Sequence, residues 1–121
     1  MDQLSEAYDA CASYFGVLSA PMRLRIMRAI CDEEKTVSQI VEETGATQTS
    51  VSRQLNTMHR RGVLARRKTG TKVHYRIADA ALVEICRTAC KRVSEVLAAE
   101  RSRRADRPAQ EPAAKPGSGR A

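Results

Sequence analysis

Residues 45–77, GATQTSVSRQLNTMHRRGVLARRKTGTKVHYRI, are the part of the sequence that decides the fold. Thr47 belongs to the residue types that begin a helix, and Gly62 to those that end one. Between them, apolar residues recur at helical spacing: Val51, Leu55 and Met58. The pattern therefore predicts one amphipathic helix that ends at about Arg61.

The polar face of this predicted helix carries short or planar hydrogen-bonding side chains, where an ordinary solvated helix shows long Glu and Lys pairs. Side chains of Gln, Asn, Ser, Thr and Arg can match the donors and acceptors on the edges of DNA bases. We therefore expect this polar face to form hydrogen bonds with the edges of DNA bases. The candidate residues are Gln48, Thr49, Ser50, Ser52, Arg53 and Gln54.

Two short runs, residues 63–68 and 72–77, follow the predicted helix. In the second run, apolar residues alternate strictly with polar ones, as in a half-buried strand. Gly70, in the loop between the runs, supplies the positive φ that a tight hairpin loop requires. The sequence thus predicts a two-stranded hairpin, and a helix followed by a basic hairpin is typical of a winged helix on DNA.

Positive charge is concentrated in the same part of the chain. Residues 53–76 hold eight basic residues and no acidic one, whereas residues 1–52 have a balance of −4 and residues 77–100 of −1. Because the charge coincides with the predicted helix and hairpin, it favours a nucleic-acid surface over an ordinary solvated face. The candidate phosphate contacts on the hairpin are Arg67, Lys68, Lys72 and His74.

Length and composition limit the other possibilities. A chain of 121 residues is one domain with at most a tail, and a single Phe with no Trp predicts an aliphatic core. So few aromatic side chains also argue against a platform that stacks single-stranded bases. The sequence has no paired carboxylates, no nucleophile with a base and no glycine-rich phosphate loop, so it predicts a protein that is not an enzyme.

The N-terminus, MDQLSEAYD, is acidic and polar, unlike a signal peptide. No apolar run approaches the roughly 20 residues that span a bilayer. The sequence therefore predicts a cytoplasmic protein, and in that compartment its four cysteines are expected as thiols.

The remaining pattern predicts helices on both sides of this segment. They occupy residues 4–18, from Pro21 to near Cys31, from Thr36 or Val37 to Gly45, and a last long helix that Asp79 caps. Two helices joined by a turn that contains Gly form a helix-turn-helix. The predicted fold is α+β, mainly α: a winged helix-turn-helix with about five helices and a two-stranded wing.

Residues 1–100 form the predicted DNA-binding and dimerisation domain, and residues 101–121, rich in Pro and with a charge of +4, are predicted to be a disordered basic tail. The first and last helices are amphipathic and lie outside the unit that would read DNA. Dimerisation through these helices would present two recognition helices to successive major grooves. We therefore expect a homodimer on a double-stranded DNA operator.

The stretch LSAPMRLRIMRAI, residues 18–30, resembles the second helix of the ArsR/SmtB family of bacterial winged-helix repressors. TSVSRQL and RRGVL resemble the family's recognition helix and the entry to its wing, and the likeness covers roughly residues 4–98. The resemblance implies a homodimeric DNA-binding repressor that leaves its operator when an inducer occupies a sensor site.

This sequence departs from the family's familiar sensor sites. Where metalloid-sensing members carry a Cys-x-Cys pair, it has Thr36 and Ser38. Where zinc-sensing members carry Asp, His, His and Glu on the last helix, it has Asp79, Ala81, Arg92 and Glu95. The thiol positions of persulfide-sensing members correspond to Arg28 and Ser94. A thiol sensor must therefore use other residues.

Cys86 and Cys90 lie one turn apart on the predicted last helix. At that spacing Cβ atoms are about 5–6 Å apart, whereas a disulfide needs about 3.5–4.5 Å, so the pair suits a bridging ion better than a bond. Thiolates select soft ions, here As(III) or a soft divalent metal ion. Cys11 would add a third thiolate if the first and last helices pack together.

Two alternatives stay open. A sensor of reactive sulfur species or oxidants on the same fold would use Cys31, Cys86 and Cys90. Otherwise the cysteines are small buried residues, and the chain is a winged-helix regulator without thiol sensing.

Overall fold

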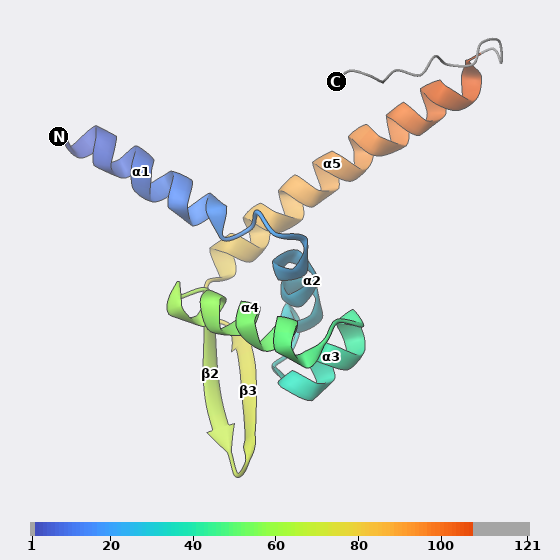
Figure 1. Ribbon diagram of the computed structural model, residues 1–121. Helices are drawn as coiled ribbons and strands as arrows, with labels where there is room; N and C mark the ends of the chain where they lie inside the picture. The colour runs from blue at the N-terminus through green and yellow to red at the C-terminus, as the bar shows by residue number, and fades with distance from the viewer. Residues whose placement is uncertain (1, 108–121) are drawn as a thin grey trace, which may run out of the picture. The chain divides into compact units, whose positions relative to one another are not determined.

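The computed structural model describes residues 2–107, which form helices and one small sheet (Figure 1). In chain order the elements are α1 (Gln3–Gly16), α2 (Pro21–Ile30), β1 (Lys35–Thr36), α3 (Val37–Thr44), α4 (Gln48–Arg60), β2 (Leu64–Thr69), β3 (Lys72–Ile77) and α5 (Ala80–Asp106). The predicted fold class, a mainly helical winged helix-turn-helix, is confirmed. The chain divides into two compact units, and the division lies between Arg87 and Thr88, within α5.

The helix-turn-helix consists of α3, residues 45–47 and α4. The Thr36 hydroxyl accepts from the Gln39 N–H at 3.2 Å, and the Gln39 amide oxygen accepts from the Thr36 N–H at 2.8 Å, which is a capping box. Gly45 ends α3 with a φ of 75°, a left-handed conformation that favours glycine. Thr47 then begins α4 by accepting from the Ser50 N–H at 3.1 Å. These local signals fix the turn, and all of them are visible in the sequence.

The core of the first unit joins α2, α3, α4, the hairpin and the start of α5. The three apolar residues that define the inner face of α4 are 0% exposed, as the sequence predicts: Val51, Leu55 and Met58. Their main partners in the core are also aliphatic: Ile26, Ile30, Ile40 and Leu82. Burial of one such side chain is worth about 1.5–3 kcal/mol, so this core fixes α4 against the rest of the unit.

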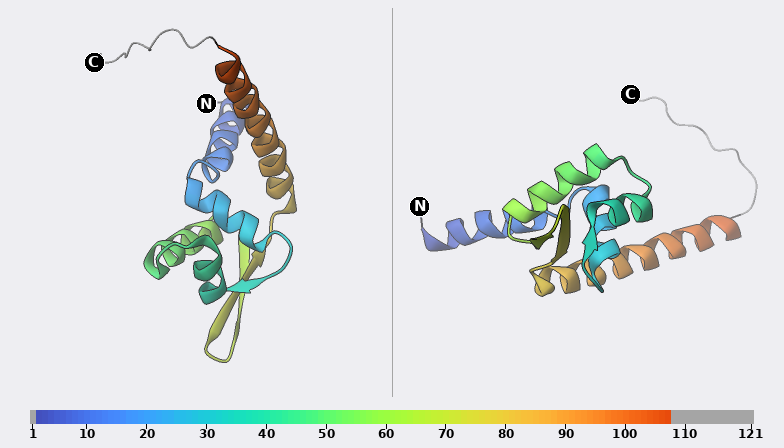
Figure 2. Two further views of the ribbon diagram at one scale, coloured as in Figure 1. Left: turned by 90° about the vertical axis from the view of Figure 1, so that its right-hand side faces the viewer. Right: turned by 90° about the horizontal axis from the view of Figure 1, so that it is seen from below.

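The sheet has three strands in the order β1-β3-β2, whereas the sequence predicts only the two strands of the hairpin. The additional strand, β1, is two residues long, and its Lys35 pairs with Tyr75 of β3. Such a short strand cannot show an alternating pattern, which is why the sequence gives no sign of it. In the hairpin, Tyr75 is buried, and Figures 1 and 2 show β2 and β3 projecting away from α4.

The apolar stripe of the first predicted helix, residues 4–18, is exposed in the single chain. Leu4, Tyr8 and Phe15 have exposed fractions of 61%, 66% and 50%, and α1 contains no buried residue. Helical spacing shows that one face of this helix is apolar, and it does not show whether the same chain or a second copy covers that face.

The described part of the second unit is the remainder of α5, up to Asp106, and the following residue Arg107. Residues 101–106 therefore lie in a helix, although the composition predicts that a disordered tail begins at residue 101; Arg and Ala are good helix formers even when exposed. Residues 108–121, the rest of that predicted tail, lie outside the described residues. Within residues 2–107, no helix has both the length and the apolar character that membrane crossing requires.

Candidate nucleic-acid interface

The predicted reading face is on the solvent side of α4. Gln48, Thr49 and Arg53 are exposed, and Ser50 and Ser52 are half-buried. Gln48, Thr49 and Ser50 lie in the first turn, where backbone N–H groups and the helix dipole favour an anion such as a phosphate. The buried inner face holds α4 in place, so these polar side chains are presented outward from a fixed support.

The hairpin extends the polar surface of α4. Lys68 and Lys72 lie near its tip, both exposed, while Thr69 pairs with Lys72 and leaves Gly70 and Thr71 as the connecting loop. Gly70 has a φ of 63°, as the tight loop requires. His74, predicted to lie on the phosphate side, is half-buried and pairs with Thr36 of β1.

A pocket of about 250 Å³ lies where α3, α4 and the hairpin loop meet. Its lining includes Ser38 from α3, Gln48 from α4 and Lys72 from β3. The structure thus brings together two of the predicted DNA-contacting residues, Gln48 and Lys72, although 24 positions separate them in the sequence.

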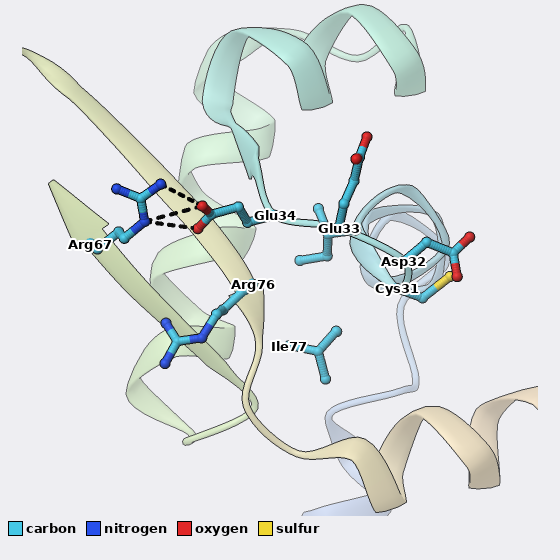
Figure 3. Close-up of a pocket in the computed structure, with 8 residues that line it drawn as sticks. Cys31, Asp32, Glu33, Glu34, Arg67, Arg76 and Ile77 are labelled. Atoms are coloured by element: carbon cyan, nitrogen blue, oxygen red, sulfur yellow. Dashed lines mark hydrogen bonds and ion pairs between the residues drawn. The ribbon is translucent and has the colours of Figure 1, made fainter. Parts of the chain in front are cut away.

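Arg67, a predicted phosphate contact, forms an ion pair with Glu34. Its Nε donates to both carboxylate oxygens at 3.1 Å and its Nη2 donates to one of them, so the guanidinium grips the carboxylate with two nitrogens (Figure 3). The hydrogen bond from Arg67 lowers the pKa of Glu34 below its ordinary value, and burial opposes this only in part. A phosphate must therefore compete with Glu34 for Arg67.

Gln54, a predicted base-reading residue, is turned toward α2. Its amide oxygen accepts a hydrogen bond from Nε of Arg23 at 2.8 Å, and both side chains are half-buried. Sequence reasoning missed this contact and the Glu34 pair. Nothing in the spacing signals them, because the partners lie 31 and 33 positions apart.

The four cysteines differ in exposure. Cys11 and Cys90 are exposed, whereas Cys31 and Cys86 are half-buried against the core. Among the described residues, no three His, Cys, Asp or Glu side chains are grouped so that they could hold a metal ion. The three-thiolate cluster that the sequence suggests is thus not assembled within the described part of a single chain.

Cys31 lies at the end of α2, beside a pocket of about 590 Å³ that is lined by residues 31–34 and by Arg67 and Arg76 (Figure 3). Its thiol donates to the backbone oxygen of Arg28 at 3.3 Å. A hydrogen bond with Cys31, followed by the charge of Glu84, raises the pKa of the Arg87 guanidinium. A cation therefore stands beside this thiol.

Comparison with known proteins agrees with this geometry. Residues 20–65, which include the helix-turn-helix, match the model of the family described as bacterial regulatory protein, arsR family. The HTH-type transcriptional regulator Rv0081 of Mycobacterium tuberculosis is 30% identical over 91 residues, which are 74% of this chain and 80% of that protein. Its crystal structure matches with a TM-score of 0.68 at 28% identity and covers 83% of this chain and 98% of that one.

Two further relatives are informative. A homodimeric winged helix-turn-helix DNA-binding domain from Mycobacterium bovis matches with a TM-score of 0.69 at 25% identity, over 78% of this chain and 88% of that one. A probable mercury resistance operon repressor from Streptomyces lividans is 30% identical over 77 residues, 64% of this chain and 62% of that protein.

These relatives are DNA-binding transcriptional regulators, which confirms the prediction that the protein is not an enzyme. The helix-turn-helix, the basic hairpin and the match to Rv0081 lead to one conclusion. The chain belongs to the ArsR/SmtB family of bacterial winged-helix transcriptional regulators.

Proposed function

We propose that the protein is a repressor that binds a DNA operator as a homodimer and is released when an inducer acts on its cysteine thiols. One observation supports the proposed DNA binding: the polar face of α4 and the basic hairpin adjoin at one pocket, which Gln48 and Lys72 both line. On this proposal α4 lies in a major groove and reads base edges, and the hairpin contacts the adjacent backbone.

The dimer is supported by the apolar faces of the terminal helices. Leu4, Tyr8 and Phe15 of α1 are at least half exposed, and the apolar residues Val93, Val96 and Leu97 of α5 are 38–55% exposed. Large apolar side chains gathered on a face favour association with a partner. A second copy of the chain is the proposed partner, and the homodimeric relative from Mycobacterium bovis supports it.

The thiol sensor is proposed on α5, where Cys86 and Cys90 are one turn apart. Two thiolates suit a soft ion, and As(III) or a soft divalent metal ion is the proposed inducer. The Streptomyces lividans relative, named for a mercury resistance operon, favours an ion of this class. Two thiolates can hold a linearly coordinated ion such as Hg(II), whereas As(III) takes a third thiolate, for which Cys11 is the candidate.

Oxidation or persulfidation is the second candidate, and one contact favours it. The Cys31 thiol contacts the Arg87 guanidinium, and reactive cysteines commonly lie beside such basic groups. On this alternative Cys31, Cys86 and Cys90 react with an oxidant or a reactive sulfur species instead of binding an ion. A regulator without thiol sensing remains the third possibility.

The test is release from DNA, measured with Hg(II), arsenite, Cd(II), Zn(II), a persulfide and a peroxide side by side. One of them should lower operator affinity by about 1–3 kcal/mol, the usual size of allosteric coupling. The double variant Cys86→Ser with Cys90→Ser should bind DNA normally and no longer respond. Cys31→Ser is the matched variant, because it leaves Cys86 and Cys90 of α5 unchanged. If this variant is no longer released from DNA, the result favours the redox mechanism. A response that survives both sets of substitutions would refute thiol sensing.

A further inference from the structure

Arg23 of α2 forms hydrogen bonds with two other helices. Its Nη1 donates to the backbone oxygens of Gly16 and Val17 at 3.2 and 3.3 Å, and its Nε donates to the Gln54 amide oxygen at 2.8 Å. The first two acceptors lie at the end of α1 and the third lies in the middle of α4. One guanidinium therefore ties the end of α1 to the recognition helix.

Two further contacts anchor the same end of α1. Arg61, the C-cap of α4, donates from Nη1 to the Ser13 hydroxyl at 2.9 Å, and Tyr14 donates from its hydroxyl to Asp79 at 2.9 Å. Asp79 in turn accepts from the Leu82 N–H at 3.1 Å at the start of α5. Tyr14 of α1 packs against the core, but α1 contains no buried residue, so these polar contacts add to a small apolar attachment.

We propose that Arg23 is a positioning residue for operator recognition, which holds α4 at a fixed angle to the end of α1 through Gln54. The proposal rests on the proposed function, because it assumes that α4 reads the operator. Gln54 then serves as the acceptor for Arg23. This differs from the role that its place on the polar face suggests, which is contact with a base.

The chemistry of the two side chains supports these roles. Arginine presents its Nε and Nη donors in a rigid planar fork, so it can hold acceptors on two helices at once, which a lysine ammonium on a flexible stem does much less well. A glutamine that reads adenine uses its amide oxygen and its amide nitrogen together. The Gln54 oxygen is already engaged by a charged donor, and hydrogen bonds of this type are the strong ones.

Through the same contacts, the packing of α1 can affect how α4 binds DNA. The exposed apolar side chains of α1 are the proposed surface for the second copy, and the end of the same helix holds α4 through Arg23 and Arg61. A change in how α1 packs in the dimer would therefore move α4 through these hydrogen bonds. Both recognition helices must keep their spacing to fit successive grooves, so a small rotation is enough to weaken binding.

The experiment compares two affinities at one salt concentration: for the duplex that the wild type selects from a random pool, and for an unrelated duplex of equal length. Arg23→Lys keeps the charge and should lower affinity for the selected duplex by about tenfold to a hundredfold, the value of a charged hydrogen bond. Affinity for the unrelated duplex should change less than about twofold, because phosphate attraction does not depend on the angle of α4. Arg25→Lys, on the exposed side of α2, is the matched control and should change neither.

Substitution of Gln54 separates the positioning role from base reading. Gln54→Glu keeps an acceptor for Arg23 and should preserve the ratio of the affinities for the selected and unrelated duplexes. Gln54→Leu removes the acceptor and should lower that ratio. Arg23→Lys combined with Gln54→Leu should be no worse than the poorer single variant, because both remove one contact. Loss of folding would lower both affinities together and would appear in thermal unfolding, so it cannot imitate a change in the ratio.

The outcomes separate the two claims. A wild type that selects no duplex would refute the proposed function. If the wild type is selective and Arg23→Lys has the same ratio of affinities for the selected and unrelated duplexes, the positioning role alone is overturned. The positioning role is also overturned if Gln54→Glu and Gln54→Leu lower that ratio equally, which is the result expected of a base-reading glutamine. Should Arg23→Lys fail to fold, the two Gln54 variants still decide the question.

Discussion

The ion pair between Glu34 and Arg67 shows how one residue can change the affinity of a surface for an anionic ligand such as a phosphate. Arg67 is exposed on β2, where a phosphate could reach it, but Glu34 from the loop after α2 holds its guanidinium (Figure 3). The exposed pair adds little to folding, because water and salt screen it. Its main effect is on ligands: in the free protein it cancels one positive charge of the hairpin.

Glu34→Gln should strengthen binding to any duplex, because Arg67 then becomes available to a phosphate. The slope of the logarithm of affinity against the logarithm of salt concentration should steepen by about 0.9, the value for one further phosphate contact. Titrations at several salt concentrations measure it. Glu33→Gln removes the same charge from an exposed neighbour in the same loop and should leave the slope nearly unchanged. Equal slopes in wild type and Glu34→Gln would show that Arg67 does not contact DNA.

The same pair predicts a pH dependence of stability. The hydrogen bond from Arg67 holds the pKa of Glu34 below its ordinary value of 4.5. The unfolded chain therefore takes up this proton at a higher pH than the folded chain, so the contribution to the free energy of unfolding is complete above pH 4.5 and is lost as the pH falls through the folded pKa. Urea unfolding of wild type and Glu34→Gln across this range should show the difference shrinking toward acid. A difference that is constant with pH would contradict the assignment.

At the scale of elements, the sequence was a good guide wherever the signal was local. The caps Thr36 and Thr47, the left-handed Gly45 and the buried stripe of α4 all lie within a few residues of the structure that they determine. The strand β1 and the contacts of Gln54 and Arg67 depend on partners more than 30 positions away. Spacing along one chain contains no information on such pairings, so the elements were predictable and part of the candidate site was not.

The two elements of the interface should contribute differently to DNA binding. Lys68→Ala or Lys72→Ala, near the hairpin tip, should weaken all duplexes alike, because phosphates carry no sequence information. Gln48→Ala or Ser52→Ala on α4 should mainly reduce preference for the selected duplex, by about 1–3 kcal/mol for each lost base contact. Affinities of the four variants for selected and unrelated duplexes measure both effects. Loss of preference in the lysine variants would instead place base reading on the hairpin.

At the scale of the whole molecule, the proposed dimer predicts the effect of a charge on α5. Val93 is 55% exposed in the single chain. If a second copy covers it, Val93→Glu should bury an unpaired carboxylate and weaken the dimer by several kcal/mol. Sedimentation at micromolar protein concentration should then show a monomer for this variant.

Ala98→Glu adds the same charge at an exposed position on the other side of the helix from Val93, Val96 and Leu97, and should remain a dimer. A wild-type chain that sediments as a monomer under the same conditions would contradict the proposed assembly.

The position of β2 in the sheet has a further consequence, for the solubility of the protein when no DNA is present. In the order β1-β3-β2, this strand is at the edge, and an edge strand offers unpaired backbone groups to which another chain can add. Arg66, Arg67 and Lys68 occupy the middle of β2 and are exposed, so two such edges repel one another. The charges proposed to attract DNA therefore also protect the free protein from aggregation. Replacing them with β-branched apolar residues would allow the β2 strands of two chains to associate.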